Sequence, residues 1–268
     1  MKLLAGDARF EISALGAQTT VFIYCPVRSV APGVLLLFHG KGRRAEQMRD
    51  WARSLADQAG LIVVAPLLDR DRFPNWRYQR AGIVHNDQLQ PPALWTGSLI
   101  KTIVDWAREW LGDTQAPYYL YGHSAGGQFL SRTAAYMPQT DAKRIVLANP
   151  SLYVTPSLDE KAPYGFAGLF DRRTAKSRLQ DYLRLPITIY VGERDVGDKD
   201  LVQDAPAARQ GVNRLERGVN VFRSAQAVAR ERDWQFNWRL VIVPDVGHSS
   251  KDMLQAAAIL QALDLDVC

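Results

Sequence analysis

The chain has 268 residues, 47% of them hydrophobic, and a formal net charge of +5. This length suggests one large domain or two small ones, and α/β folds often reach this size as a single unit. We predict a single domain over residues 1–268. Its apolar runs are far shorter than the roughly 20 residues of a membrane helix. Asp7 and Arg9 interrupt any signal-peptide core, and no nucleic-acid motif accompanies the scattered basic residues. We therefore predict a cytoplasmic protein with neither a membrane nor a nucleic-acid partner.

Short apolar stretches alternate with amphipathic ones along most of the chain. In the first half we expect strands at 20–24, 34–38, 61–65 and 118–121, and helices at 45–58, 93–111 and 125–136. The charged, proline-rich and aromatic stretch 69–92 is expected to form a long loop. In the second half we expect strands at 145–148, 187–191 and 238–243, and helices at 172–183, 220–232 and 250–263.

Largely apolar strands with helices between them are typical of a parallel sheet that helices cover on both faces. We therefore predict an α/β fold with a mostly parallel sheet. Functional groups of such folds gather beyond the carboxyl ends of the strands. The two cysteines, Cys25 and Cys268, are expected to be free thiols, and no cysteine and histidine cluster has zinc spacing. The prediction is that the protein uses no metal or other cofactor.

The strongest motif is Gly122-His123-Ser124-Ala125-Gly126, which matches the G-x-S-x-G nucleophile elbow. A strand is expected before it and a helix after it. The sharp turn between them crowds the serine, and glycines two residues away on either side remove side chains that would clash. The helix N-terminus favours negative charge that develops beside the serine. Ser124 is therefore the predicted nucleophile.

A serine nucleophile needs a base, and the chain has four histidines. His123 lies inside the elbow, His39 ends a strand, and His85 lies in the long loop. His248 follows the last predicted strand, at the carboxyl edge of the sheet, and is the predicted base. The base needs a carboxylate to orient it. Asp195, which follows the strand at 187–191, is the predicted acid. Its competitors are Glu193, Asp198, Asp200 and Asp245.

The tetrahedral intermediate needs an oxyanion hole, which combines the N–H after the nucleophile with one from a loop after an early strand. The first N–H is that of Ala125. Phe38-His39-Gly40-Lys41-Gly42 is the candidate loop, and we predict that Lys41 supplies the second N–H, with Gly42 as its rival. His39 is expected to orient this loop and to transfer no proton.

These motifs, with Gly192-Glu193-Arg194-Asp195 and Gly247-His248, resemble the α/β-hydrolase superfamily in order and in spacing. The resemblance covers nearly the whole chain. Within the superfamily the chain looks like bacterial esterases related to polyhydroxyalkanoate depolymerases and feruloyl esterases. It implies hydrolysis of carboxylic esters without a cofactor, and a small-molecule ester as the partner. The secreted depolymerases carry signal peptides and substrate-binding modules, and we expect neither here, which puts a polymer substrate in doubt.

Superfamily members place a lid between the strand after the elbow and the strand before the acid, which here is residues 152–185. Its apolar side chains either line a substrate pocket or pack the insertion onto the core; they are Tyr153, Tyr164, Phe166, Leu169 and Phe170. The polar stretch 204–219 and the aromatic loop 73–78 are further candidate walls. Two rival functions remain, an amidase or peptidase and a non-catalytic binding module.

Overall fold

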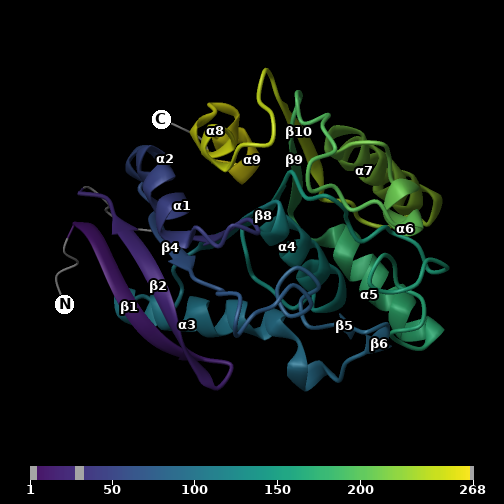
Figure 1. Cartoon of the computed structure of the whole chain (residues 1–268), viewed down its shortest axis with the longest axis horizontal. Coiled ribbons are helices and arrows are strands. Elements are labelled where there is room, and N and C mark those ends of the chain that lie inside the picture. Colours follow the sequence, from purple (N-terminus) through teal and green to yellow (C-terminus); the bar gives the residue numbers. More distant parts are fainter. Residues whose placement is uncertain (1–4, 28–32, 266–268) are drawn as a thin grey trace.

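The core of the protein is an eight-stranded sheet, with the strand order β1-β2-β4-β3-β7-β8-β9-β10 (Figure 1). The structure is a computed structural model, and it describes residues 5–27 and 33–265. Six neighbouring strands from β4 to β10 run parallel, and β1 and β2 continue the sheet as an antiparallel pair. The predicted α/β fold with a mostly parallel sheet is therefore confirmed. The strands of this sheet are β1 (Gly6–Ala14), β2 (Ala17–Cys25), β3 (Val34–Phe38), β4 (Ile62–Pro66), β7 (Tyr118–His123), β8 (Arg144–Ala148), β9 (Ile187–Gly192) and β10 (Arg239–Val243).

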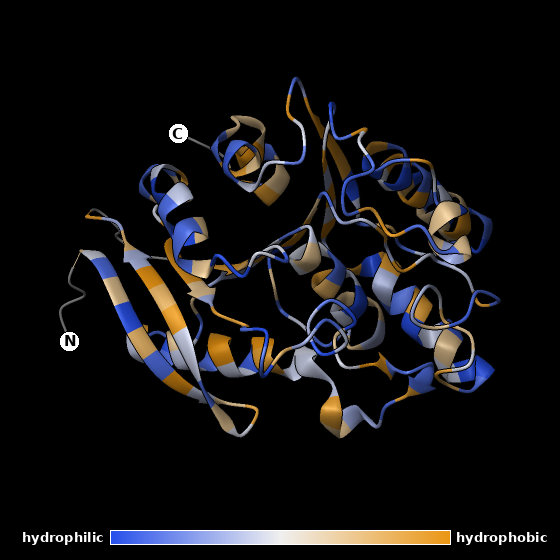
Figure 2. Cartoon of the chain, in the orientation of Figure 1, coloured by the Kyte–Doolittle hydropathy of each residue, from blue (hydrophilic) through white to orange (hydrophobic). Residues whose placement is uncertain are grey.

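Helices cover both faces of the sheet. α3, α4, α5 and α7 contribute to one apolar cluster, and α1, α2, α8 and α9 contribute to the other. The helices are α1 (Ala45–Trp51), α2 (Arg53–Ala59), α3 (Leu99–Leu111), α4 (Ala125–Tyr136), α5 (Arg172–Arg184), α6 (Ala205–Ala208), α7 (Arg214–Glu231), α8 (Ser250–Gln255) and α9 (Ala258–Leu263). β3, β4, β8 and β9 are buried along their whole length, whereas the helices carry both polar and apolar residues (Figure 2). This is the arrangement that a parallel sheet requires.

The first strand of the N-terminal hairpin, β1, was not predicted from the sequence, whereas β2 contains the strand predicted at 20–24. β1 pairs with β2 from Gly6 opposite Cys25 to Ala14 opposite Ala17. β1 lies at the sheet edge, and most of its residues alternate between exposed and half-buried. Asp7, Arg9 and Glu11 occupy exposed positions, which weakens the apolar signal of the strand. Cys25 is a buried free thiol, as expected, and Cys268 lies outside the described residues.

Several predicted helices have different bounds in the structure. The helix at 45–58 is divided at Ala52, and the helix at 250–263 is divided at Ala256, whose backbone is extended. The helix expected from residue 93 begins at Leu99, because two short 3-10 helices precede it and leave Leu94 exposed. α7 begins six residues before the predicted start, at a cap where Asn213 accepts the N–H of Glu216. An Asn followed three residues later by Glu is a helix-start signature.

The segment 152–185 is irregular up to residue 170 and then forms α5. Tyr153 and Phe166 are fully buried, and Leu169 and Phe170 pack against the same core cluster. These contacts favour the packing interpretation for the aromatic side chains, while the lid role of the segment stays a prediction. A two-stranded ladder, β5 (Val84–His85) with β6 (Gln88–Leu89), lies within the predicted loop at 69–92. Over the described part of the chain, no helix has the length and apolarity needed to cross a membrane.

Candidate active site

The strand-to-helix turn at Ser124 has the strained geometry of a nucleophile elbow. Ser124 has φ +55° and ψ −108° between β7 and α4, and its N–H donates to the Ala148 carbonyl at 2.8 Å. A Cβ on Gly122 would lie 2.4 Å from the Gly126 carbonyl oxygen, and a Cβ on Gly126 would lie 2.0 Å from the Phe38 oxygen. These positions therefore tolerate only glycine without a backbone shift. The turn presents the Ser124 side chain at the carboxyl edge of the sheet.

The loop after β10 brings His248 to the serine. His248 Nε2 lies 3.1 Å from Ser124 Oγ, and the imidazole is 30% exposed. Its other nitrogen, Nδ1, lies 2.7 Å from Asp195 Oδ2. A carboxylate can only accept a hydrogen bond, so Nδ1 is the donor and Nε2 is left to accept the serine proton. This is the tautomer that a general base requires.

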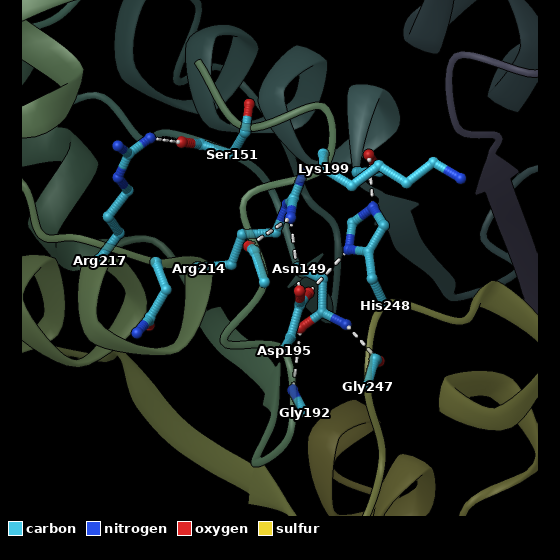
Figure 3. Close-up of polar contacts among 12 residues, drawn as sticks. Asn149, Ser151, Gly192, Asp195, Lys199, Arg214, Arg217, Gly247 and His248 are labelled. Atoms are coloured by element: carbon cyan, nitrogen blue, oxygen red, sulfur yellow. Dashed lines mark hydrogen bonds and ion pairs between the residues drawn. The ribbon is translucent and has the colours of Figure 1, made fainter. Parts of the chain in front are cut away.

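Asp195 follows β9 and is only 2% exposed. The four competing carboxylates do not share its position. Glu193 accepts the N–H of Asp245, Asp245 pairs with Arg194, and Asp200 pairs with Lys41. The fourth, Asp198, is exposed. Asp195 is thus the carboxylate that the structure brings to His248 (Figure 3). It contacts Nδ1, whereas Nε2 faces Ser124.

Two residues that the sequence pattern did not single out tie these loops together (Figure 3). Asn149, which follows β8, accepts the Gly192 N–H at 2.9 Å and donates to the Gly247 carbonyl at 3.3 Å. It therefore bridges the segments that precede the acid and the base. Arg214, at the start of α7, places Nη1 3.4 Å from Asp195 Oδ1. The stretch 204–219 was expected to border the entrance as a polar segment, but Arg214 is 1% exposed.

The loop after β3 passes beside the nucleophile, since a Cβ on Gly40 would lie 3.8 Å from Ser124 Cβ. His39 holds this loop from within the core: its Nδ1 lies 2.9 Å from the Gly40 carbonyl, and its Nε2 accepts the Leu68 N–H at 3.1 Å. Tyr78 donates its hydroxyl hydrogen to the His39 carbonyl at 2.5 Å. The loop 73–78 was a candidate pocket wall, but its Tyr78 side chain is buried and anchors the glycine loop through this hydrogen bond.

A pocket of about 380 Å³ opens at these loops. Ser124, His248 and the glycine loop line it, together with Met48 and Trp51. Its charged lining side chains are Lys41, Arg44, Asp200 and Lys251. A larger pocket, of about 620 Å³, lies between α3 and α4 beside Tyr118, at the opposite end of β7, and it contains no nucleophile–base pair. The smaller pocket is therefore the site where chemistry can occur.

The structure was compared with known proteins. No protein-family model matches the chain, and no curated protein matches it in sequence. Among solved structures, poly(aspartic acid) hydrolase-1 from Sphingomonas sp. KT-1 is 32% identical, with a TM-score of 0.87 over 98% of this chain and 99% of that one. The chain belongs to the α/β-hydrolase superfamily. A poly(3-hydroxybutyrate) depolymerase from Bordetella parapertussis, LpqC, is 27% identical, with a TM-score of 0.86 over 96% of this chain and 90% of that one.

More distant α/β-hydrolases share the fold. An S-formylglutathione hydrolase from Agrobacterium tumefaciens is 17% identical, with a TM-score of 0.57 over 96% of this chain and 94% of that one. Together with the 32% and 27% identical hydrolases, these similarities show that the protein is a hydrolase with a serine-hydrolase fold. As is usual in open α/β sheets, its candidate site lies beyond the carboxyl ends of the strands. The loops after β3, β7, β9 and β10 supply it.

Two histidines of this α/β-hydrolase are buried beside the site. Their burial predicts that acid lowers the free energy of unfolding. Burial lowers the pKa of His39 to about 4, and burial, followed by the charges of His248 and Arg214, lowers the pKa of His123 well below its ordinary range. Below pH ~6.5 the unfolded chain binds a proton at each position and the folded chain does not. The stability that these neutral histidines contribute is therefore complete above pH ~6.5 and is lost as the pH falls toward the folded values.

We expect the free energy of unfolding to fall by about 1.4 kcal/mol per pH unit for each buried histidine below pH ~6.5. Urea titrations at several pH values measure this slope. Because glutamine does not titrate, His39→Gln should remove the contribution of one proton, about 1.4 kcal/mol per pH unit, from the slope between pH ~6.5 and ~4. An unchanged slope in that variant would mean that His39 takes up its proton equally in both states.

Proposed function

We propose that the protein is a serine hydrolase that cleaves carboxylic esters through an acyl-enzyme intermediate. Ser124 is the nucleophile, His248 the general base and Asp195 the acid that orients the base. The observation that carries this proposal is the chain of two hydrogen bonds, 2.7 Å from Asp195 to His248 and 3.1 Å from His248 to Ser124. Three separate loops supply these residues, so the fold brings them together although they are far apart in the sequence.

In the proposed acylation, His248 Nε2 removes the proton of Ser124 Oγ, and the oxygen attacks the ester carbonyl carbon. The resulting imidazolium is stabilised by the Asp195 carboxylate. When the intermediate collapses, Nε2 gives the proton to the leaving alcohol and the acyl group remains on Ser124. Water then attacks the acyl-enzyme, with His248 as base again, and the carboxylic acid leaves.

The oxyanion is proposed to bind the N–H groups of Ala125 and Lys41. Ala125 is the first residue of α4, where an N–H has no acceptor within the helix. Lys41 belongs to the loop that passes Ser124, and the anchoring of this loop by His39 and Tyr78 supports a fixed donor. Donors that are held in place before the reaction stabilise developing charge without reorganisation.

The acyl preference and the preference for esters over amides can be tested with p-nitrophenyl esters from acetate to palmitate, each compared with the matched p-nitroanilide. The pocket of about 380 Å³ is small for a ligand site, so we expect the highest kcat/KM for short acyl chains. We expect the esters to be cleaved faster than the anilides. Higher activity on palmitate would contradict the small pocket, and preferential cleavage of the anilide would support an amidase.

A second candidate function is hydrolysis of amide bonds in an acidic polymer. Lys41, Arg44 and Lys251 line the pocket beside Ser124, and cationic side chains attract carboxylates. The 32% identical structure is that of a poly(aspartic acid) hydrolase. Shortening of poly(aspartic acid), measured by size-exclusion chromatography, would favour this candidate if it weakened with added salt.

A further inference from the structure

Arg214 is a buried cation that meets the candidate acid directly. The Arg214 and Asp195 side chains are 1% and 2% exposed, and Nη1 lies 3.4 Å from Oδ1. The other carboxylate oxygen, Oδ2, faces His248. The carboxylate therefore lies between two partners, the imidazole on one side and the guanidinium on the other (Figure 3). A charge this deeply buried is costly unless it is paired.

The two terminal nitrogens of Arg214 also hold the loop that follows the acid. Nη2 donates to the Lys199 carbonyl at 2.7 Å, and Nη1 lies 3.5 Å from the Gly197 carbonyl. The next residue along the chain, Asp200, pairs with the ammonium of Lys41. A single guanidinium therefore holds both the acid and the loop that follows it.

We propose that Arg214 is a positioning residue of the active site, which orients Asp195 and sets the charge that His248 experiences. The proposal rests on the proposed function of Ser124, His248 and Asp195. Arg214 does not line the substrate pocket, so it acts through the acid and makes no contact with the substrate. We expect its loss to lower kcat and to leave KM nearly unchanged.

The charge of Arg214 offsets part of the Asp195 charge at the imidazole. Without the guanidinium, the carboxylate would attract the positive charge that develops on the imidazole more strongly. The other charged and titratable groups near the pair are His123, whose ring lies 4.9 Å from that of His248, buried Tyr153, and Lys41, Asp200 and Lys251 of the pocket. None of these residues is substituted in an Arg214 variant, and Arg214→Lys, which keeps the charge, separates the effect of the lost charge from that of a displaced loop.

Arg217 provides the matched control. It lies on the same helix three residues later, is also 1% exposed, and donates to the carbonyls of Gly211, Ser151 and Val202. No carboxylate pairs with it among the described residues. Replacing either arginine by methionine removes one buried guanidinium, but only the Arg214 variant removes the positive charge that is paired with Asp195.

The experiment measures kcat, KM and the pH dependence of kcat/KM for Arg214→Met, Arg214→Lys, Arg217→Met and the parent protein. For Arg214→Met we expect kcat to fall roughly tenfold or more, KM to stay within about twofold, and the acid limb of the profile to move up by about one pH unit. Arg214→Lys keeps the charge and should retain most of the parent profile. Arg217→Met should unfold at lower urea and keep the acid limb in place.

Chemical rescue provides a second readout that does not depend on the variants being equally stable. Low millimolar guanidinium should restore part of the kcat of Arg214→Ala and none of that of Arg217→Ala. An acid limb that stays in place in Arg214→Met, or that moves equally in Arg217→Met, would overturn the proposal. The Ser124→Ala variant, measured in the same assay, separates this proposal from the proposed function. If Ser124→Ala is inactive, an unmoved acid limb contradicts only the role of Arg214. If Ser124→Ala is fully active, the proposed function itself is wrong.

Discussion

Replacing Ser124 by alanine should lower kcat/KM for p-nitrophenyl esters by at least about 10⁴-fold, because the acyl-enzyme can no longer form. The fold should survive. The Ser124 N–H still donates to the Ala148 carbonyl in the variant, and the flanking glycines are untouched. Alanine also has nearly the same backbone preferences at φ +55°, so we expect the free energy of unfolding to stay within about 1 kcal/mol.

The measurement combines steady-state kinetics with labelling of the protein by a fluorophosphonate, followed by mass spectrometry. The parent protein should gain one adduct on Ser124, and the variant should gain none. Ser224→Ala, on the exposed side of α7, is a control that keeps both the activity and the adduct. Parent activity in Ser124→Ala would assign the nucleophile to another residue.

The residues that the sequence predicts best are those whose role depends on local spacing. The elbow glycines are an example: Gly122 and Gly126 are needed because backbone atoms lie within 2.4 Å of where their Cβ atoms would be. The same local constraint identifies the turn from sequence. His248 and Asp195 follow strands that are apolar enough to be recognised, and parallel strands bring their carboxyl ends to one edge. Both were therefore predicted without a structure.

The supporting residues could not be predicted because their partners are distant along the chain. Arg214 meets Asp195 across 19 residues, and Asn149 meets Gly247 across 98. An arginine in a polar stretch is usually solvated, so burial of Arg214 contradicts the ordinary expectation for its residue type. Only the packing of α7 against β9 places Arg214, the first residue of that helix, next to Asp195. The cap formed by Asn213 and Glu216 was a local signal, and it marks where α7 begins.

Replacing Asp195 by asparagine should lower kcat/KM by about 10⁴-fold. The side-chain amide can donate a hydrogen bond to His248 Nδ1, which would leave the proton on Nε2 and the wrong tautomer facing Ser124. The substitution also leaves the guanidinium of Arg214 buried without its carboxylate. Breaking one side of a buried pair in this way costs about 3 kcal/mol of unfolding free energy.

Activity and stability should separate when both partners are replaced. In Asp195→Asn combined with Arg214→Met, no uncompensated charge remains at a position that is 1–2% exposed, so at least half of the lost unfolding free energy should return. The kcat/KM should stay as low as in Asp195→Asn, because the imidazole still lacks its carboxylate. Urea unfolding and ester kinetics on the two single variants and the double variant measure both effects. If the double variant loses the sum of the unfolding free energies that the two single variants lose, the two side chains are energetically independent, and the charge of Arg214 must be compensated by the carbonyls of Gly197 and Lys199 alone.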